Sequence, residues 1–458
     1  MSIFESCIFL QQLSKFNSDM KVNTLILISG VLLFLSGCKK DNDSSNNPPT
    51  WSDLKITISE FQESNDSIRI TWSKLDVSNF QGYYIIRRNY KATDTTQYNY
   101  NEVIESISDP SITSFTDVGV PTDSYLEYQV MGKFYHSTDH VTTTIYSNVR
   151  SLERPEMKKF RFNPKDILQD NANHRLYVID NDSGKISILD YKSREITRQV
   201  FTFATLGFSS IGTFNGAEEL YVPRNDGWIY IYDANTLEKT DQIKAGTKCY
   251  SVIYNTGKLF AVVDTSYYGY AVKVFDRAGK SLITHTGIIE GPEHLALVPG
   301  SNTRLFGING YRVFSFEYDP NGHYISWNLT SYSSSGYTYR AFETFPNGQG
   351  FITSRTGSVY SNSLNLVQNL PYGDNEYSAF TFNSPLTSLF AGCSNYKHVV
   401  EYSCPGYSEL QTYPCKGYPA AVFTDAGNLV VLSSVYTSSW YSDPVDYYLE
   451  SILLGTKK

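Results

Sequence analysis

Apolar and polar residues alternate in short runs along most of this chain. Alternation with a period of two places successive side chains on opposite faces of a strand. Between residues 51 and 152 the alternation recurs in six segments separated by polar turns, a pattern typical of a β-sandwich. The segments are Leu54 to Phe61, Ile68 to Trp72, Tyr83 to Arg88, Thr113 to Asp117, Tyr125 to Lys133 and Thr142 to Ser147.

From residue 158 to residue 458 the alternating segments repeat with a period of about 40 residues. Residues 174–190 and 219–233 align best: each has Leu-Tyr-Val, a turn, and Ile-x-Ile-x-Asp. Weaker copies begin near residues 258, 304, 349, 389 and 428, which makes seven units. Several short strands per unit and no helical pattern predict an all-β fold with a β-propeller of seven blades. Six or eight blades are the alternatives.

A propeller has to close its ring, because an open ring leaves unpaired strand edges. The last unit offers three strands, Tyr418 to Thr424, Leu429 to Ser434 and Tyr447 to Leu454. We expect the segment from Lys158 to Phe162 to supply the fourth strand by pairing with Tyr447 to Leu454.

Two resemblances support this organisation. Residues 51–152 resemble a fibronectin type III domain, through Ile68 to Trp72 with its core tryptophan, Gly82 to Arg88, Thr113 to Asp117 and Tyr128 to Gly132. Leu126 stands where that family usually places a corner tyrosine, so the corner hydrogen bond is in question. The resemblance implies a spacer, or else an adhesion module. Residues 158–458 resemble propellers of the YVTN/NHL class, clearly in the first two units.

The start of the chain has the pattern of a secretory signal. Met20-Lys21 is followed by an apolar run to Leu35 and then by Leu35-Ser36-Gly37-Cys38. This box resembles the lipobox of bacterial lipoproteins, which implies cleavage before Cys38 and lipid on its sulfur, sufficient for stable membrane attachment. We take residues 1–37 as the signal region, with Met20 as the true start. The alternative is an ordinary signal peptide with an incidental cysteine.

Residues 38–50 are rich in Lys, Asp, Asn, Ser and Pro, and we expect a flexible lipidated tether because they have little to bury. An acidic tether after the lipidated cysteine resembles the surface-export signals of Bacteroidetes lipoproteins. The sequence therefore predicts an outer-membrane lipoprotein, facing the surface or the periplasm.

Amino-acid composition argues against some classes of partner and favours others. The net charge is −8 and charged residues are only 18% of the chain, with no basic cluster after the signal region, which argues against a nucleic-acid partner. The 37 tyrosines suit the binding of neutral ligands such as sugars, although strand propensity explains most of them. Beyond Cys7 and Cys38 four cysteines remain: Cys249, Cys393, Cys404 and Cys415. In an oxidising compartment a disulfide among them and free buried thiols are both open.

Propellers bind ligands where their innermost strands begin, so equivalent positions there form a ring at the channel mouth. Alignment of the strand starts predicts a first ring of Lys165, Ser209, Tyr250, Glu293, Arg340, Tyr377 and Tyr418. The next position gives a second ring of Asp166, Ser210, Ser251, His294, Ala341, Ser378 and Pro419. Tyrosines, cations and an acid in one place suit a sugar or small polar ligand. The alternative is that Lys165, Glu293 and Arg340 pair with one another and close the channel.

The leading hypothesis is a non-enzymatic binding module whose ligand is a glycan, a peptide or an envelope protein. A lyase or hydrolase using Glu293, His294 and Arg340 is one alternative, and a scaffold with an exposed apolar rim is another. We predict no cofactor and no metal, because catalytic and metal motifs are missing from the sequence. The segment Asp180 to Gly184 faintly resembles a calcium loop, but Asn, Asp and Gly also belong at a hairpin turn.

Overall fold

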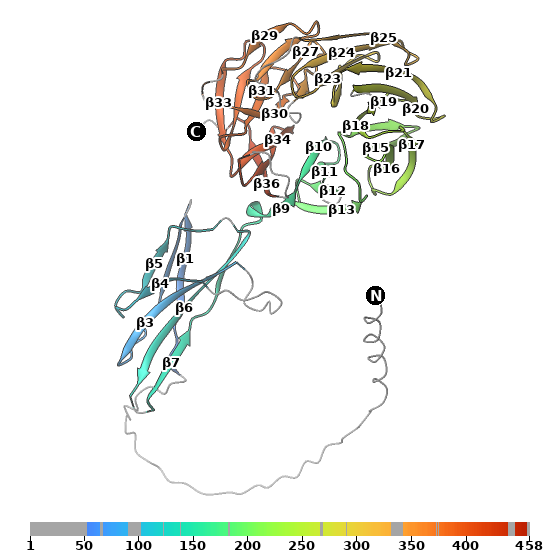
Figure 1. Ribbon diagram of the computed structural model, residues 1–458. Coiled ribbons are helices and arrows are strands. Elements are labelled where there is room, and N and C mark those ends of the chain that lie inside the picture. Colours follow the sequence, from blue (N-terminus) through green and yellow to red (C-terminus); the bar gives the residue numbers. More distant parts are fainter. Residues whose placement is uncertain are drawn as a thin grey trace, which may run out of the picture. The chain divides into compact units, whose positions relative to one another are not determined.

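The computed structural model describes residues 53–64, 67–89, 102–121, 123–137, 139–181, 184–265, 269–289, 291–330, 342–371, 373, 375–437 and 445–455. Within these ranges every regular element apart from 3₁₀ turns is a β-strand, so the fold is all-β, as predicted (Figure 1). Cys38, the expected tether and Arg340 lie outside the described residues. No helix in the described part of the chain is long and apolar enough to cross a membrane.

Two antiparallel sheets precede the propeller, with strand orders β1-β2-β5 and β4-β3-β6-β7, and β8 also pairs with β6. The strands are β1 (Ile58–Ser64), β2 (Ser67–Trp72), β3 (Phe80–Arg88), β4 (Glu102–Ile107), β5 (Ser114–Asp117), β6 (Tyr125–His136), β7 (Val141–Tyr146) and β8 (Arg150–Glu153). Trp72 of one sheet packs against Tyr83 of the other, with ring centroids 5.4 Å apart. These sheets form the expected sandwich, and its assignment to the fibronectin type III family stays a prediction. Leu126 is fully buried.

Seven four-stranded antiparallel sheets make up the propeller, in agreement with the predicted blade count. Blades 1 to 3 are β10 (Pro164–Asp170), β11 (Arg175–Asp180), β12 (Lys185–Asp190), β13 (Glu195–Phe201); β14 (Ser210–Phe214), β15 (Ala217–Pro223), β16 (Trp228–Asp233), β17 (Lys239–Lys244); and β18 (Cys249–Asn255), β19 (Lys258–Thr265), β20 (Gly269–Asp276), β21 (Leu282–Ile289). Blades 4 and 5 are β22 (His294–Leu297), β23 (Arg304–Ile308), β24 (Val313–Tyr318), β25 (Tyr324–Leu329); and β26 (Phe342–Thr344), β27 (Gly350–Thr353), β28 (Ser358–Ser361), β29 (Leu366–Asn369). Blades 6 and 7 are β30 (Tyr377–Phe382), β31 (Ser388–Cys393), β32 (His398–Ser403), β33 (Glu409–Pro414); and β34 (Tyr418–Asp425), β35 (Asn428–Ser434), β36 (Val445–Leu453), β9 (Lys159–Phe162).

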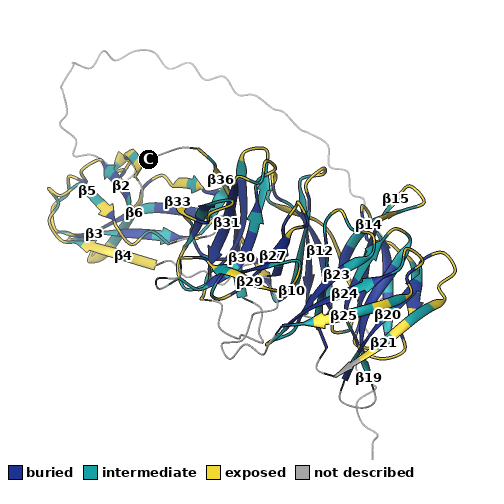
Figure 2. Ribbon diagram, turned by 90° about the horizontal axis from the view of Figure 1, so that it is seen from above, coloured by how far each residue is buried: buried dark blue, intermediate teal, exposed yellow. Residues whose placement is uncertain are grey.

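The order of strands within a blade follows from their side chains. The second strands are buried along most of their length, and β31 along all of it, because a neighbouring blade covers each face. The fourth strands, such as β13, are mostly exposed. First strands accordingly lie near the centre of the ring and fourth strands at its rim, and the yellow stretches of β21 and β25 mark that rim (Figures 1 and 2).

The ring closes where β9 pairs with β36. Phe160 lies opposite Tyr447, and Phe162 lies opposite Val445. Both phenylalanines are buried in the core shared by blades 7 and 1. This pairing confirms the predicted closure by residues 158–162.

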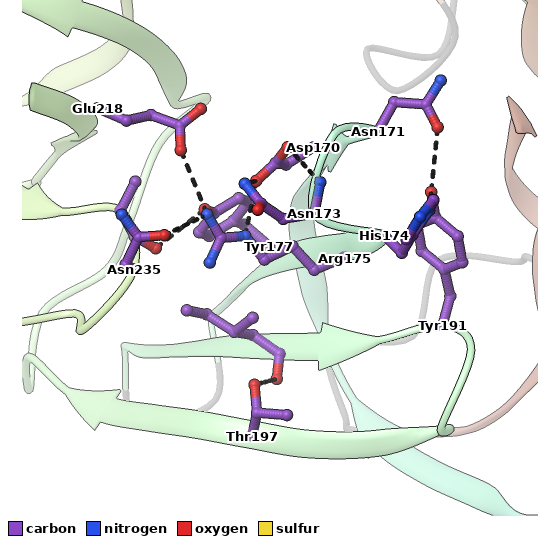
Figure 3. A network of polar contacts seen from close by, with 12 residues as sticks. Asp170, Asn171, Asn173, His174, Arg175, Tyr177, Tyr191, Thr197, Glu218 and Asn235 are labelled. Carbon is purple, nitrogen blue, oxygen red and sulfur yellow. Dashed lines mark hydrogen bonds and ion pairs between the residues drawn. The ribbon is translucent and has the colours of Figure 1, made fainter. Parts of the chain in front are cut away.

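We call the end at which the first strands begin the upper end of the propeller, and the opposite end the lower end. At the lower end a polar network joins blades 1 and 2 (Figure 3), and His174 adds a contact with blade 7. Arg175 Nε lies 2.6 Å from Asp170 Oδ2, and Arg175 Nη2 lies 3.2 Å from Glu218 Oε2 of blade 2. His174 Nδ1 lies 3.1 Å from Asp425 Oδ2 of blade 7. The network therefore ties the closing blade to its two successors.

A second lower-end network joins blades 2 and 3. The guanidinium of Arg277 is buried and lies 2.7 Å from Glu219 Oε1 and 3.0 Å from Asp241 Oδ2. Tyr221 donates a further hydrogen bond of 2.6 Å to Glu219. Each buried charge here has an opposite charge as its partner, which is the arrangement that makes burial of ions tolerable.

The four cysteines after residue 248 are free thiols. Cys249 and Cys393 are buried and the other two are partly buried. Burial raises the pKa of the Cys249 thiol to about 12, so this cysteine stays protonated and packs as a small apolar side chain. The sequence left open a disulfide among these cysteines or free thiols, and the structure shows free thiols.

Candidate functional site

The first ring predicted at the channel mouth does not form one site. Six of its members are described, and they separate into a stack at the channel, a cluster between blades 3 and 4, and isolated residues. Ser209 is buried, and its hydroxyl donates to the Gly207 carbonyl at 3.3 Å. Arg340 lies outside the described residues.

Irregular pairing explains why the alignment failed. A β-bulge interrupts the first strand of several blades at its upper end, so that one extra residue falls between two consecutive pairs of the register. The extra residues are Lys165 in blade 1, Tyr250 in blade 3, Ser378 in blade 6 and Ala420 in blade 7. The equivalents of Lys165 and Tyr250 in blades 6 and 7 are therefore Ser378 and Ala420. The choice of Tyr377 and Tyr418 was wrong by one and two positions.

Tyr377 accordingly belongs to the core of blade 6 and not to the channel mouth. Its side chain is 1% exposed, and its hydroxyl lies 2.6 Å from both the Pro371 carbonyl oxygen and the Tyr402 hydroxyl. Tyr418 is half-buried, and its ring centroid lies 5.5 Å from the Lys397 ammonium. Neither tyrosine contacts the other predicted site residues in the described part of the chain.

The second ring has a structural role. Four of its members bond to the backbone at or next to the first strand of the following blade. The bonds are Ser209 N to Asp166 Oδ2 at 2.8 Å, Tyr254 N to Ser210 Oγ at 3.0 Å, Leu295 N to Ser251 Oγ at 3.1 Å, and Ser378 Oγ to the Pro419 carbonyl at 2.5 Å. These bonds join blades 1 and 2, 2 and 3, 3 and 4, and 6 and 7 close to the axis, and Ala341 of this ring lies outside the described residues.

His294 is the exception in the second ring, because it joins an aromatic stack at the channel. Its ring lies parallel to that of Phe208, with centroids 3.9 Å apart and an angle of 7°. Phe342 meets His294 edge-on at 5.9 Å, and the Lys165 ammonium lies 4.1 Å from the Phe208 centroid. Side chains from blades 1, 4 and 5 thus meet around Phe208, which precedes β14. A cation–π contact and stacked rings occupy this part of the channel.

A second cluster combines two tyrosines with two opposite charges between blades 3 and 4. The rings of Tyr250 and Tyr270 lie 5.3 Å apart, and the Lys248 ammonium lies 4.4 Å from the Tyr250 centroid. The Tyr270 hydroxyl donates to Glu293 Oε1 at 3.2 Å. Both tyrosines are half-buried, so each ring keeps an exposed part. We call these four residues the Tyr250 cluster.

A cavity of about 80 Å³ lies next to the aromatic stack, with Lys165 and Phe342 in its wall. The rest of its lining is largely apolar and comes from the first strands of blades 1, 5, 6 and 7. The small residues Ala379, Ala420 and Ala421 leave this space open. Pockets that enclose a ligand of ordinary size measure about 300–1,000 Å³. The cavity has room for a few water molecules and not for a sugar.

Glu343 lies in the cavity wall, and its pKa is strongly shifted. Burial raises the pKa of its carboxyl group from 4.5 to about 8. Glu343 is therefore mostly protonated at neutral pH, and it can donate a hydrogen bond to water in the cavity.

Sequence reasoning missed Phe208, Tyr270 and Glu343. Phe208 precedes its strand, Tyr270 lies on a third strand, and Glu343 lies one residue inside the strand start. Only Glu343 carried a sequence signal, as a carboxyl group on a short apolar first strand.

Of the residues proposed for a lyase or hydrolase, Glu293 and His294 contact different neighbours, and Arg340 lies outside the described residues. Glu293 directly precedes His294, the first residue of β22, and the two side chains lie against different residues. Glu293 contacts Tyr270, whereas His294 stacks on Phe208. No group of three metal-ligating side chains occurs in the described part of the chain. Asp180 of the calcium-like turn pairs with Lys185 at 3.1 Å, and residues 182 and 183 of that turn lie outside the description.

No model of a protein family matches this chain, and no curated protein matches it. Similar solved structures include hydrazine synthase of Kuenenia stuttgartiensis, with 12% identity and a TM-score of 0.49 over 65% of this chain and 97% of that one. Raptor of Chaetomium thermophilum has 12% identity and a TM-score of 0.48 over 64% of this chain and 29% of that one. The β-propeller domain of Cps50 (Swd1) of Myceliophteria thermophila has 10% identity and a TM-score of 0.45 over 64% and 99%.

The fold is a β-propeller. At these identities the likeness concerns the fold alone, because propellers carry many unrelated functions.

Proposed function

We propose that this protein is an outer-membrane lipoprotein, attached through lipid on Cys38, whose propeller binds a glycan or another small polar ligand at the Tyr250 cluster. The observation that carries the proposal is the combination of two half-exposed tyrosine rings with the Glu293 carboxylate and the Lys248 ammonium. Aromatic faces pack on sugar C–H groups, and the charged groups bond to hydroxyls.

The small volume of the cavity favours a ligand site on the surface of the propeller. The cavity of about 80 Å³ is too small for a sugar ring, and Phe208 and His294 stack beside it. The Tyr250 cluster lies on two neighbouring blades, outside the residues that line the cavity. A ligand there would therefore bind on the upper end of blades 3 and 4.

A glycan-array screen of the full chain tests the binding site. We expect the double variant Tyr250→Ala with Tyr270→Ala to lose binding, because both aromatic surfaces are removed. Tyr146→Ala is the matched control, since it removes an exposed tyrosine from the sandwich strand β7. Equal binding by parent and double variant would contradict the site, and the lack of any bound glycan would contradict the ligand class.

Fractionation of cells that express Cys38→Ala tests the anchor. We expect the parent chain in the outer-membrane fraction, labelled by a palmitate analogue, and the variant unlabelled and released from the membrane. A labelled or membrane-bound variant would contradict lipid attachment at Cys38. Protease treatment of intact cells then distinguishes the surface from the periplasmic face.

One observation favours a scaffold as the second candidate function. The rim strand β29 exposes Leu366 and Val367, at 55% and 59%. The strand has no charged residue to protect its edge, unlike β13. If this rim docks an envelope protein, a photo-crosslinker at position 366 will capture one defined partner, and a crosslinker at the exposed position 198 of β13 will not.

A further inference from the structure

The connection between blades 1 and 2 carries the most exposed large apolar side chain in the described part of the propeller. Phe203 is 85% exposed, and Phe201 at the end of β13 is 49% exposed. The two rings lie 6.3 Å apart at an angle of 26°. Together they form an apolar knob at the upper end of the rim, which we call the phenylalanine pair.

Several hydrogen bonds hold the loop that presents this pair. The Thr202 N–H and hydroxyl each donate to the Gly184 carbonyl at 2.9 Å. Arg224 Nη1 donates to the Thr202 carbonyl at 3.2 Å, and Asn225 N donates to the Thr205 carbonyl at 3.0 Å. The loop is fixed on the turns of two blades, so a partner would meet a preorganised surface that costs little entropy to bind.

The backbone at Phe203 is strained. Its φ is +55°, in the left-handed region that non-glycine residues rarely adopt. Most other propeller residues with positive φ occupy hairpin turns that recur from blade to blade, such as Arg194, Leu237 and Lys280. Phe203 is outside those turns. Strain combined with exposure of an aromatic ring gives the isolated protein no benefit, and such residues are concentrated at binding sites.

Neighbouring residues indicate the chemistry of the partner. Trp228 follows the turn that holds the loop, and the Lys244 ammonium lies 6.0 Å from its ring. Lys244 and Lys248 are exposed, whereas the nearby Asp226 is ion-paired with Arg224 at 2.5 Å. Exposed aromatic side chains beside lysines are typical of proteins that bind the interface of an anionic bilayer.

We propose that the phenylalanine pair inserts into the surface of a lipid bilayer and that Lys244 binds anionic headgroups beside it. This contact belongs to the propeller itself and is additional to the lipid on Cys38 and to the Tyr250 cluster. A bilayer suits a convex knob, because acyl chains accommodate it without a complementary pocket.

Sedimentation with lipid vesicles tests this proposal, using the full chain with Cys38→Ala in every sample so that no acyl group contributes. We expect the chain to sediment with vesicles of phosphatidylcholine and phosphatidylglycerol, and less with phosphatidylcholine alone. Phe203→Gly should lower the partition coefficient about tenfold or more, because a buried aromatic surface is lost. Lys244→Gln should reduce only the difference between the two kinds of vesicle.

Phe203→Gly also separates binding from folding. Glycine accepts a positive φ without strain, so the thermal midpoint should stay the same or rise while vesicle binding falls. Phe203→Trp should bind vesicles as the parent does, because an aromatic side chain is kept, and its tryptophan fluorescence should shift to shorter wavelength when vesicles are added. Val118→Ala, at an exposed position of the sandwich, is the control and should bind like the parent.

Two results would overturn the proposal. One is a folded chain that sediments with neither kind of vesicle, which would point to a protein partner for the phenylalanine pair. The other is undiminished binding by Phe203→Gly. Glycan binding by Phe203→Gly should match the parent, so failure of the bilayer contact and failure of the Tyr250 cluster are distinguishable.

Discussion

The lower end of the propeller and its channel use their charged side chains in different ways. At the lower end Arg277 lies between Glu219 and Asp241, and Arg175 lies between Asp170 and Glu218. In the channel the Lys165 ammonium lies against a phenylalanine ring, and Glu343 borders a cavity. Charges that pair with opposite charges hold blades together, whereas the Lys165 ammonium faces an aromatic ring and the Glu343 carboxyl group faces a cavity. The comparison teaches that charged residues of the blades can serve either to join blades or to line the channel, and that their contacts decide which.

The largest effect should come from breaking the lower network. Arg277→Ala leaves the buried Glu219 carboxylate without its partner, and the free energy of unfolding should fall by about 3–5 kcal/mol. Urea denaturation followed by tryptophan fluorescence measures this loss. Arg198→Ala removes an exposed arginine of β13 and serves as the control. A loss below about 1 kcal/mol for Arg277→Ala would show that the lower network does not hold blades 2 and 3.

The upper cavity should make stability depend on pH. Because the pKa of Glu343 is about 8 in the folded state and 4.5 when unfolded, the folded state binds the extra proton between these values. Stability is therefore lost as pH rises through this window, by at most about 1.4 kcal/mol per pH unit.

Glu343→Gln tests that dependence. Glutamine cannot lose a proton, so the variant should gain stability relative to the parent chain as pH rises from 5 to 8. Above about pH 8 the difference should become constant. Urea denaturation at several pH values gives the comparison, and parallel pH profiles for the two chains would contradict the raised pKa.

The inter-blade hydrogen bonds of the upper end should have a smaller effect. Ser251→Ala leaves the Leu295 N–H without its acceptor, which should cost about 1–3 kcal/mol. Its neighbour Tyr250, the extra residue of the bulge, should matter for ligand binding and little for stability. Thermal unfolding of Ser251→Ala and Tyr250→Ala measures the contrast. If Ser251→Ala and Tyr250→Ala lost the same stability, it would be wrong to assign a structural role to Ser251 and a binding role to Tyr250.

The smallest effect should come from Lys165→Ala at the channel. The variant removes a cation–π contact with Phe208 worth about 0.5–1 kcal/mol. Loss of more than that would indicate that Lys165 makes a stronger interaction inside the channel. Denaturation at low and at high salt concentration shows how much of this stability loss is electrostatic. Salt screens the contact between the Lys165 ammonium and the Phe208 ring only where solvent reaches it.

Much of the fold was predictable from the sequence, because blades repeat their pattern. Tyr177 and Tyr221 mark equivalent second strands, and the need to pair β36 identified residues 158–162 as the closing strand. The site was less predictable. Alternation gives the period of a strand, but a bulge shifts every later side chain to the other face. At Tyr377 this placed a core residue in the predicted ring, and Phe208 was missed because it precedes its strand.

The closing pair of strands has a consequence for how this chain reaches its final state. β9 opens the propeller's sequence and β36 ends it, so their pairing has a sequence separation that spans the entire ring. Contacts of such separation form late, because a long loop must be closed first. Until then Phe160 and Phe162 stay uncovered and the edge of β36 is unpaired, both of which promote aggregation. A chain truncated before Val445 lacks β36, so Phe160 and Phe162 would remain exposed in it. Burial of these two rings therefore distinguishes a complete propeller from a truncated one.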